Sequence, residues 1–265
     1  MPNKVCLLTI DPQIDFCEGG ALPVTGATKD LERLAKMVDK FGGDIEDIQI
    51  TMDSHYHIHI AHSAFWRDPA GAQPKPFTAI SEDDVISGKW RPVSPDWKDW
   101  ALQYVQQLKQ NARYMLVIWP DHCIIGSRGH AIQPAFFDAV TRWEHKYSAM
   151  APRTTKGSNP FTEHFSAVKA DVPRADDEST RLNGRFVKTL QQFDTILISG
   201  EALSHCVANT IRDVAAEFSD DQIKKFVLLE DASSNVGGFE AMGKQFVDDM
   251  VKKGMQIAKT DTYFK

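Results

Sequence analysis

Short runs of apolar residues alternate along the chain with segments whose apolar residues recur at helical spacing. The segments that predict strands lie near residues 5–10, 45–53, 114–118, 150–155, 195–198 and 226–229, and the fourth of them, MAPRTT, gives only a weak apolar signal. The helical stripes between and after them begin at Leu31, Trp100, Phe136, Phe186, Leu203 and Phe239. Buried strands separated by amphipathic helices are typical of a parallel sheet covered on both faces. The sequence therefore predicts an α/β fold, a three-layer αβα sandwich around a mostly parallel, about six-stranded sheet.

The segment at about 63–99 interrupts this alternation. It contains the stretch PAGAQPKPF and two tryptophans in KWRPVSPDW, without a sustained period. A bare connection of this length is uncommon inside a compact domain. We interpret it as an insertion between the second and third predicted strands, within one domain that spans residues 1–265. A lid, an oligomer contact and a plain surface excursion are all consistent with its composition.

The composition is that of a globular protein that folds without covalent staples. Hydrophobic residues make up 42% and charged residues 25% of the 265 residues. The net charge of −6 disfavours a nucleic acid or an anionic membrane as partner, because both select a basic face. No signal peptide and no membrane-length apolar run are visible. Four scattered cysteines without a Cys-x-x-Cys pair favour reduced thiols and a cytoplasmic location.

Chemically active side chains follow each predicted strand at its carboxyl end. Ligands of open parallel sheets bind at that edge. In chain order these side chains are Asp11, Asp53, His55, His122, Lys156, Cys206 and Asp231. Because the carboxyl ends of parallel strands meet at one edge, the sequence predicts a site that gathers a nucleophile, an acid, a base and metal ligands.

Cys206 is the candidate nucleophile of this site. It begins the predicted helix that carries Val207 and Ile211, where free backbone N–H groups and the helix dipole favour a thiolate. The same N–H groups suit a developing oxyanion. Asp11 is placed to take the thiol proton, and Lys156 to stabilise negative charge. A structural cysteine and an ordinary Asp–Lys ion pair are the alternatives.

The run from Asp53 to His62 is dense in imidazole. Asp53 and His55, together with the distant His122, make an oxygen-and-nitrogen donor set suited to zinc, iron or manganese. His59 and His62 compete for the place of a further ligand, and the spacing does not decide between them. A histidine-rich surface without metal is the other interpretation.

Five ordered blocks resemble the nicotinamidases of the isochorismatase-like cysteine hydrolase superfamily. They are DPQIDFCEGGAL from Asp11, DSH from Asp53, WPDHCIIG from Trp119, KG at Lys156 and SGEALSHCV from Ser199, and they span nearly the whole chain. The resemblance implies the Rossmann-like αβα fold and a catalytic triad of Asp11, Lys156 and Cys206.

The resemblance also implies the surroundings of the triad. The metal would be held by Asp53, His55 and His122, and would bind the pyridine nitrogen of nicotinamide. Phe16 and Trp119 would pack on the substrate ring. A cis peptide bond before Ala202 would let the N–H groups of Ala202 and Cys206 form the oxyanion hole. Family members often form homo-oligomers, so a homo-oligomer is expected from the resemblance alone.

The implied reaction is hydrolysis of nicotinamide to nicotinate and ammonia through a cysteine thioester, a step of NAD salvage. The alternatives are a related amidohydrolase acting on another small carboxamide or an N-carbamoyl compound, a metallohydrolase whose histidines activate water directly, and a non-catalytic binding protein of the same fold. Two departures from the family bear on the substrate. The insertion is longer than in compact nicotinamidases, and Glu201 stands where a smaller or apolar residue is expected.

Overall fold

A parallel sheet of six strands forms the centre of the computed structural model, which describes residues 3–111 and 114–265. The strands are β1 (Val5–Ile10), β2 (Asp47–Asp53), β7 (Arg153–Lys156), β8 (Thr195–Gly200), β9 (Phe226–Leu229) and β10 (Gln256–Ala258). Their order across the sheet is β10-β9-β8-β1-β2-β7, and every neighbouring pair is parallel. The predicted α/β sandwich is confirmed.

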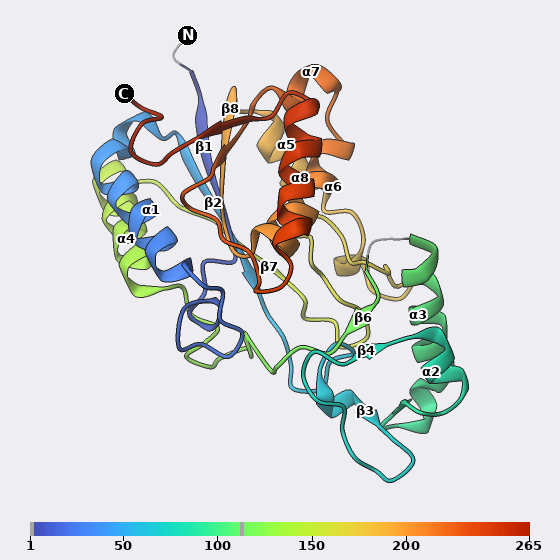
Figure 1. Cartoon of the computed structure of the whole chain (residues 1–265). Helices are drawn as coiled ribbons and strands as arrows, with labels where there is room; N and C mark the ends of the chain where they lie inside the picture. Colours follow the sequence, from blue (N-terminus) through green and yellow to red (C-terminus); the bar gives the residue numbers. More distant parts are fainter. Residues whose placement is uncertain (1–2, 112–113) are drawn as a thin grey trace.

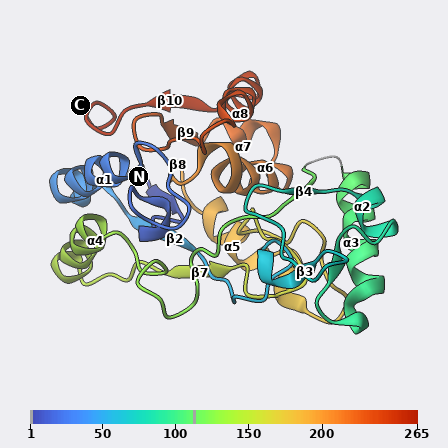
Figure 2. The same ribbon diagram turned by 60° about the horizontal axis from the view of Figure 1, so that its bottom comes forward.

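Helices cover both faces of this sheet (Figures 1 and 2). On one face lie α1 (Ala27–Phe41) and α4 (Pro134–Tyr147), and on the other lie α5 (Gly184–Gln191), α6 (Ala208–Ala216) and α8 (Glu240–Lys252). Alternate residues of β1 face opposite layers: Leu7 packs with the α1–α4 side, and Leu8 with the α5–α6–α8 side. A run that is buried on both faces explains why β1 reads as continuously apolar.

The predicted strand at 114–118 does not belong to the central sheet. Its middle forms β6 (Leu116–Val117), which pairs antiparallel with β4 (Ala79–Ile80) in a separate two-stranded ribbon. The burial of this segment alternates: Leu116 and Ile118 are buried, whereas Met115 is 57% exposed. That alternation fits a ribbon covered on one face, and not a central strand.

The sixth strand of the sheet is instead β10, which the apolar pattern did not indicate. It has three residues and a half-exposed Ile257, so it gives almost no apolar signal. The strand predicted at 150–155 begins later, at Arg153, because Met150 lies at the surface with 83% exposure.

The segment at 63–99 folds beside the carboxyl ends of the strands, together with the helix that follows it (Figure 1, lower right). It contains β3 (Trp66–Arg67), β4, α2 (Glu82–Ile86) and β5 (Arg91–Pro92), and it leads into α3 (Lys98–Asn111). A third apolar cluster, which includes Phe65, Trp66 and Tyr104, joins this region to the loops of the sheet edge. Among the described residues, no helix combines the length and apolarity needed to cross a bilayer.

Candidate active site

The predicted polar residues meet at the carboxyl edge of the sheet. Asp11 directly follows β1, Asp53 ends β2, Lys156 ends β7, and Cys206 lies six residues beyond the end of β8. The register of β2 and β7 pairs Asp53 with Lys156. Parallel strands in register therefore bring together residues that lie up to 195 positions apart in the chain.

Lys156 stands at the centre of this group. Its Nζ lies 2.9 Å from Asp11 Oδ2, 3.1 Å from Asp53 Oδ1 and 3.4 Å from Cys206 Sγ, and it donates to the carbonyl oxygen of His164 at 2.9 Å. A carboxylate oxygen of Asp11 and the sulfur of Cys206 lie within 4.8 Å of each other. Asp11, Lys156 and Cys206 are thus mutual neighbours, as the sequence predicts.

Burial dominates the electrostatics of these three side chains. It raises the pKa of Asp11 above its ordinary value, against the lowering effect of Lys156. It also raises the pKa of the Cys206 thiol, again opposed by Lys156. Burial would lower the pKa of Lys156, but the carboxylates of Asp11 and Asp53 outweigh it and raise that pKa. The resting site therefore holds a charged lysine, a protonated thiol and a carboxylate with increased proton affinity.

The loop after β8 carries Cys206 into this site. Gly200 has φ of +108°, and a Cβ there would lie 2.0 Å from the carbonyl oxygen of Ile10, so only glycine fits. The peptide bond between Glu201 and Ala202 is cis, as the resemblance implies. A π-helical turn spans Leu203–Val207 and leads directly into α6. Cys206 therefore sits in a widened turn at the start of a helix, a common location for functional residues.

The Asp–His cluster lies next to Lys156. His55 Nε2 is 3.1 Å from Asp53 Oδ1, and His122 Nε2 is 3.4 Å from Asp53 Oδ2. The other ring nitrogens are engaged by backbone carbonyls: His55 Nδ1 lies 3.0 Å from Gly157 O, and His122 Nδ1 lies 2.8 Å from Pro120 O. These contacts turn both Nε2 atoms toward Asp53, in the arrangement that orients histidine ligands of metals.

This cluster fits a divalent metal ion. Asp53 Oδ1 and His55 Nε2 lie 3.1 Å apart as a buried ion pair without an aligned hydrogen bond, so a divalent ion could take the place of the His55 proton between them. Burial would lower the pKa of His55, but the Asp53 carboxylate raises it to about 9. The carboxylate therefore stabilises positive charge at this position. A Cβ at Gly157 would lie 2.8 Å from Asp53 Oδ1, so the glycine leaves this space open.

His59 and His62 differ in their hydrogen bonding. His59 is satisfied by the backbone: its Nδ1 accepts from Ala61 N at 3.2 Å, and its Nε2 lies 3.1 Å from Thr162 O. Both ring nitrogens of His62 lack a hydrogen-bond partner in the described part of the chain, and its ring lies 5.2 Å from that of His55. Burial lowers the pKa of His62 to about 2, so this imidazole is neutral. Within the described chain, His62 therefore has ring nitrogens free of hydrogen bonds, while His55, His59 and His62 together also lie close enough to form a second candidate metal group.

A narrow cavity of about 30 Å³ opens onto Cys206 and Asp53. Phe16 and Trp119 line it, as the resemblance implies, and Phe16 also meets the ring of His122 edge-on. Sequence reasoning missed the remaining lining residues, which are Leu22, Glu163, Phe165, His205 and Val236. Most come from irregular loops, where no period marks them.

Asp231 lies elsewhere, where its carboxylate accepts from Thr260.

The segment at 63–99 and helix α3 contact the loops of the site. Trp66 Nε1 donates to Ile60 O at 2.7 Å, and Trp100 Nε1 donates to Phe161 O at 2.7 Å. The first contact holds the histidine loop, and the second holds the loop that carries Glu163.

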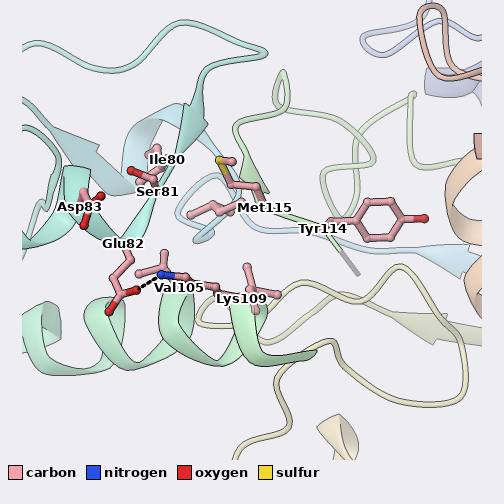
Figure 3. Close-up of a pocket in the computed structure, with 10 residues that line it drawn as sticks. Ile80, Ser81, Glu82, Asp83, Val105, Lys109, Tyr114 and Met115 are labelled. Atoms are coloured by element: carbon pink, nitrogen blue, oxygen red, sulfur yellow. Dashed lines mark hydrogen bonds and ion pairs between the residues drawn. The ribbon is translucent and has the colours of Figure 1, made fainter. Parts of the chain in front are cut away.

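A larger cavity of about 380 Å³ lies between α2, α3 and β6 (Figure 3), but no triad or cluster residue lines it.

Comparisons with known proteins find relatives by sequence and by fold. No protein-family model matches the chain. A nicotinamidase of Acinetobacter baylyi is 28% identical over 214 residues, which cover 80% of this chain and 75% of that protein. The crystal structure of the yeast nicotinamidase bound to the inhibitor nicotinaldehyde has a TM-score of 0.65 at 15% identity, covering 96% of this chain and 99% of that one. Pyrazinamidase of Pyrococcus horikoshii in complex with zinc has a TM-score of 0.56 at 18% identity, with coverages of 97% and 99%.

Proposed function

We propose, from the premise that this chain belongs to the isochorismatase-like cysteine hydrolase superfamily together with its nicotinamidase relatives, that it hydrolyses nicotinamide to nicotinate and ammonia. The chain is an amidohydrolase; nicotinamide as its substrate is the proposal. The observation that carries it is the position of Lys156 Nζ, in contact with Asp11, Cys206 and the metal-cluster residue Asp53. Lys156 thus connects the proposed nucleophile and base to the Asp–His cluster, where a bound metal would accept a pyridine nitrogen.

In the first half-reaction Asp11 acts as general base. It accepts the proton of the Cys206 thiol as the sulfur attacks the carboxamide carbon. The raised pKa of Asp11, caused chiefly by burial, suits this role because a stronger base takes a thiol proton more readily. Lys156 stays protonated and stabilises the sulfur as it gains negative charge. The N–H groups of Ala202 and Cys206 are the proposed donors to the oxyanion.

Collapse of the tetrahedral adduct breaks the carbon–nitrogen bond. Asp11 returns the proton it took from the thiol to the leaving nitrogen, which departs as ammonia and leaves an acyl thioester on Cys206. In the second half-reaction Asp11 takes a proton from water as its oxygen attacks the thioester. The carbon–sulfur bond breaks, the thiolate recovers a proton, and the carboxylic acid product leaves.

Asp53, His55, His122 and His62 would hold the divalent ion, for which zinc is our proposal. A bound ion would supply a Lewis-acid site for the ring nitrogen of the substrate. Phe16 and Trp119 line the cavity on the way to that site and would pack on the ring.

The decisive experiment measures ammonia released from a panel of amides by the purified, zinc-loaded chain. Nicotinamide and pyrazinamide are expected to be the best substrates, and nicotinaldehyde is expected to inhibit. Benzamide is the matched control, because it has the ring and the carboxamide but lacks the ring nitrogen. Faster turnover of an N-carbamoyl compound, or equal turnover of benzamide and nicotinamide, would contradict the proposed substrate.

A further inference from the structure

Glu201 is a buried acid beside the proposed oxyanion loop. It precedes Ala202, and its side chain has 0% exposure. Its Oε2 accepts from the backbone N–H of Ser234 at 3.3 Å, while its Oε1 is buried without a hydrogen-bond partner among the described residues. No lysine or arginine of the described chain forms an ion pair with it. A carboxylate in this position would be a buried charge without a compensating cation, which is strongly unfavourable.

A second acid faces Glu201 from α1. Ser234 Oγ donates to Asp30 Oδ2 at 2.6 Å, so Ser234 contacts both acids, one through its backbone and one through its hydroxyl. Asp30 also forms an ion pair with Arg33, whose Nε donates to the carbonyl oxygen of Asp231. Arg33, the cation of this group, is therefore already engaged by Asp30.

The other titratable groups around Glu201 are a further acid, Glu18, and an uncharged thiol, Cys17. Glu18 precedes α1, and hydrogen bonds from Thr28 and Gly26 lower its pKa to about 2, so it is ionised. Burial and then the charge of Asp30 raise the pKa of Glu201 well above its ordinary value. Burial likewise raises the pKa of the nearby Cys17 thiol to about 11, so this thiol adds no charge. Two facing carboxyls with one nearby cation resemble acid pairs that share a single proton.

The Ser234 segment is bonded to the loop that carries Ala202. Leu203 N donates to Ser234 O at 2.7 Å, and Ser233 Oγ donates to Gly200 O at 2.7 Å. The position of the Ser233–Ser234 segment is therefore coupled to the backbone on both sides of Ala202. A protonated Glu201 Oε1 would add a donor toward Asp30 and close the ring formed by Glu201, Ser234 and Asp30.

We propose that Glu201 is an uncharged positioning residue, which shares one proton with Asp30 across Ser234 and thereby fixes the backbone of the oxyanion loop. It touches neither the nucleophile nor the proposed substrate and acts through the Ala202 backbone. The catalytic part of this inference rests on the proposed function, but the protonation state of Glu201 does not.

Urea unfolding at several pH values tests the protonation state without any substrate. Above the ordinary carboxyl pKa the unfolded chain releases the Glu201 proton and the folded chain keeps it, so the wild type loses stability as the pH rises through this window. Glu201→Gln has no such proton. The ratio of the wild-type to the Glu201→Gln unfolding constant is expected to rise about tenfold per pH unit from pH 5.5 until Glu201 ionises.

The exposed Glu217→Gln is the matched control, for which this ratio is expected to stay constant with pH. A ratio for Glu201→Gln that is equally flat between pH 5.5 and 7.5 would show an ionised Glu201 and overturn the proposal. This outcome does not depend on which amide, if any, the chain hydrolyses.

Kinetics test the positioning role. Glu201→Gln keeps the shape and an amide hydrogen for Asp30, and is expected to retain kcat within about threefold. Glu201→Leu keeps the bulk but has no acceptor for Ser234 N–H, and is expected to lower kcat at least tenfold with little change in KM. If a folded Glu201→Leu variant has the wild-type kcat, Glu201 only fills space and the positioning role is wrong.

Discussion

Asp53 and Lys156 are register partners at the carboxyl ends of β2 and β7, and the lysine Nζ lies 3.1 Å from Asp53 Oδ1. The same Nζ contacts Asp11 and Cys206. A single buried cation therefore separates two buried carboxylates and adjoins the Cys206 thiol. The proposed thiol chemistry and the Asp–His cluster share one electrostatic environment, and a change in either is expected to alter the other.

Replacement of this cation is expected to be costly for both stability and activity. Lys156→Met leaves Asp11 and Asp53 as facing buried carboxylates, and breaking such buried pairs costs about 3–5 kcal/mol of unfolding free energy. Loss of ammonia release should be at least hundredfold. Urea unfolding measures the first effect. Lys89→Met, which removes an exposed partner of Asp84, is the control and should cost no more than about 1 kcal/mol.

Cys206 is expected to be indispensable for turnover. Cys206→Ala should lower ammonia release by about a thousandfold or more, because the covalent pathway needs the sulfur. Cys17→Ala, which removes another buried thiol, should retain activity. Iodoacetamide followed by mass spectrometry should label Cys206 in preference to the other cysteines, because Cys206 lines the cavity. A Cys206→Ala variant that keeps its activity would indicate direct metal-activated hydrolysis.

Metal binding is expected to depend on pH through His55. In the metal-free chain its pKa is about 9, so at pH 6–8 an incoming ion must displace a proton. Zinc affinity measured by titration calorimetry after chelator treatment should therefore rise about tenfold per pH unit in this range. His62→Ala should weaken zinc binding, whereas His57→Ala, an exposed histidine bonded to Asp121, should not. Equal affinities of both variants would remove His62 from the ligand set.

Acid sensitivity is expected from His205. Burial lowers its folded-state pKa to about 4, while the unfolded histidine titrates near 6.5. The unfolded chain thus binds the extra proton between these values, so stability is lost as the pH falls from 6.5 to 4, by up to about 3 kcal/mol. His205→Phe should remove the His205 share of this loss and make the acid slope in urea unfolding shallower, while His62 and His164, whose pKa values burial also lowers, keep the remainder. The exposed His145→Phe should leave the slope in place. An unchanged acid slope in His205→Phe would show that His205 is protonated when folded.

The position of the candidate site could be predicted from the sequence because it depends on where the strands end. Asp11, Asp53 and Lys156 each stand at or just beyond the end of a predicted strand, and parallel strands align their carboxyl ends whatever their order in the sheet. Strand partners were harder to predict. The run Tyr114–Ile118 is as apolar as a central strand, but only the folded chain shows that its partner is Ala79–Ile80.

The details of the cluster could not be predicted for a related reason. His59 and His62 lie in an irregular loop, and which of them is satisfied depends on the carbonyl of Thr162, a hundred positions away. Glu163 and Phe165 likewise reach the cavity from a loop without periodicity. Side chains placed by tertiary contacts leave no spacing signal in the chain.

The position of β7 has a consequence for how activity is lost. This strand has four residues, lies at the margin of the sheet and hydrogen-bonds to β2 alone within it. Peripheral strands open more easily than central ones in partial unfolding. Detachment of β7 alone would remove the Lys156 ammonium group from the site while the other five strands stayed paired. Inactivation by mild denaturant should therefore precede the loss of helical circular dichroism.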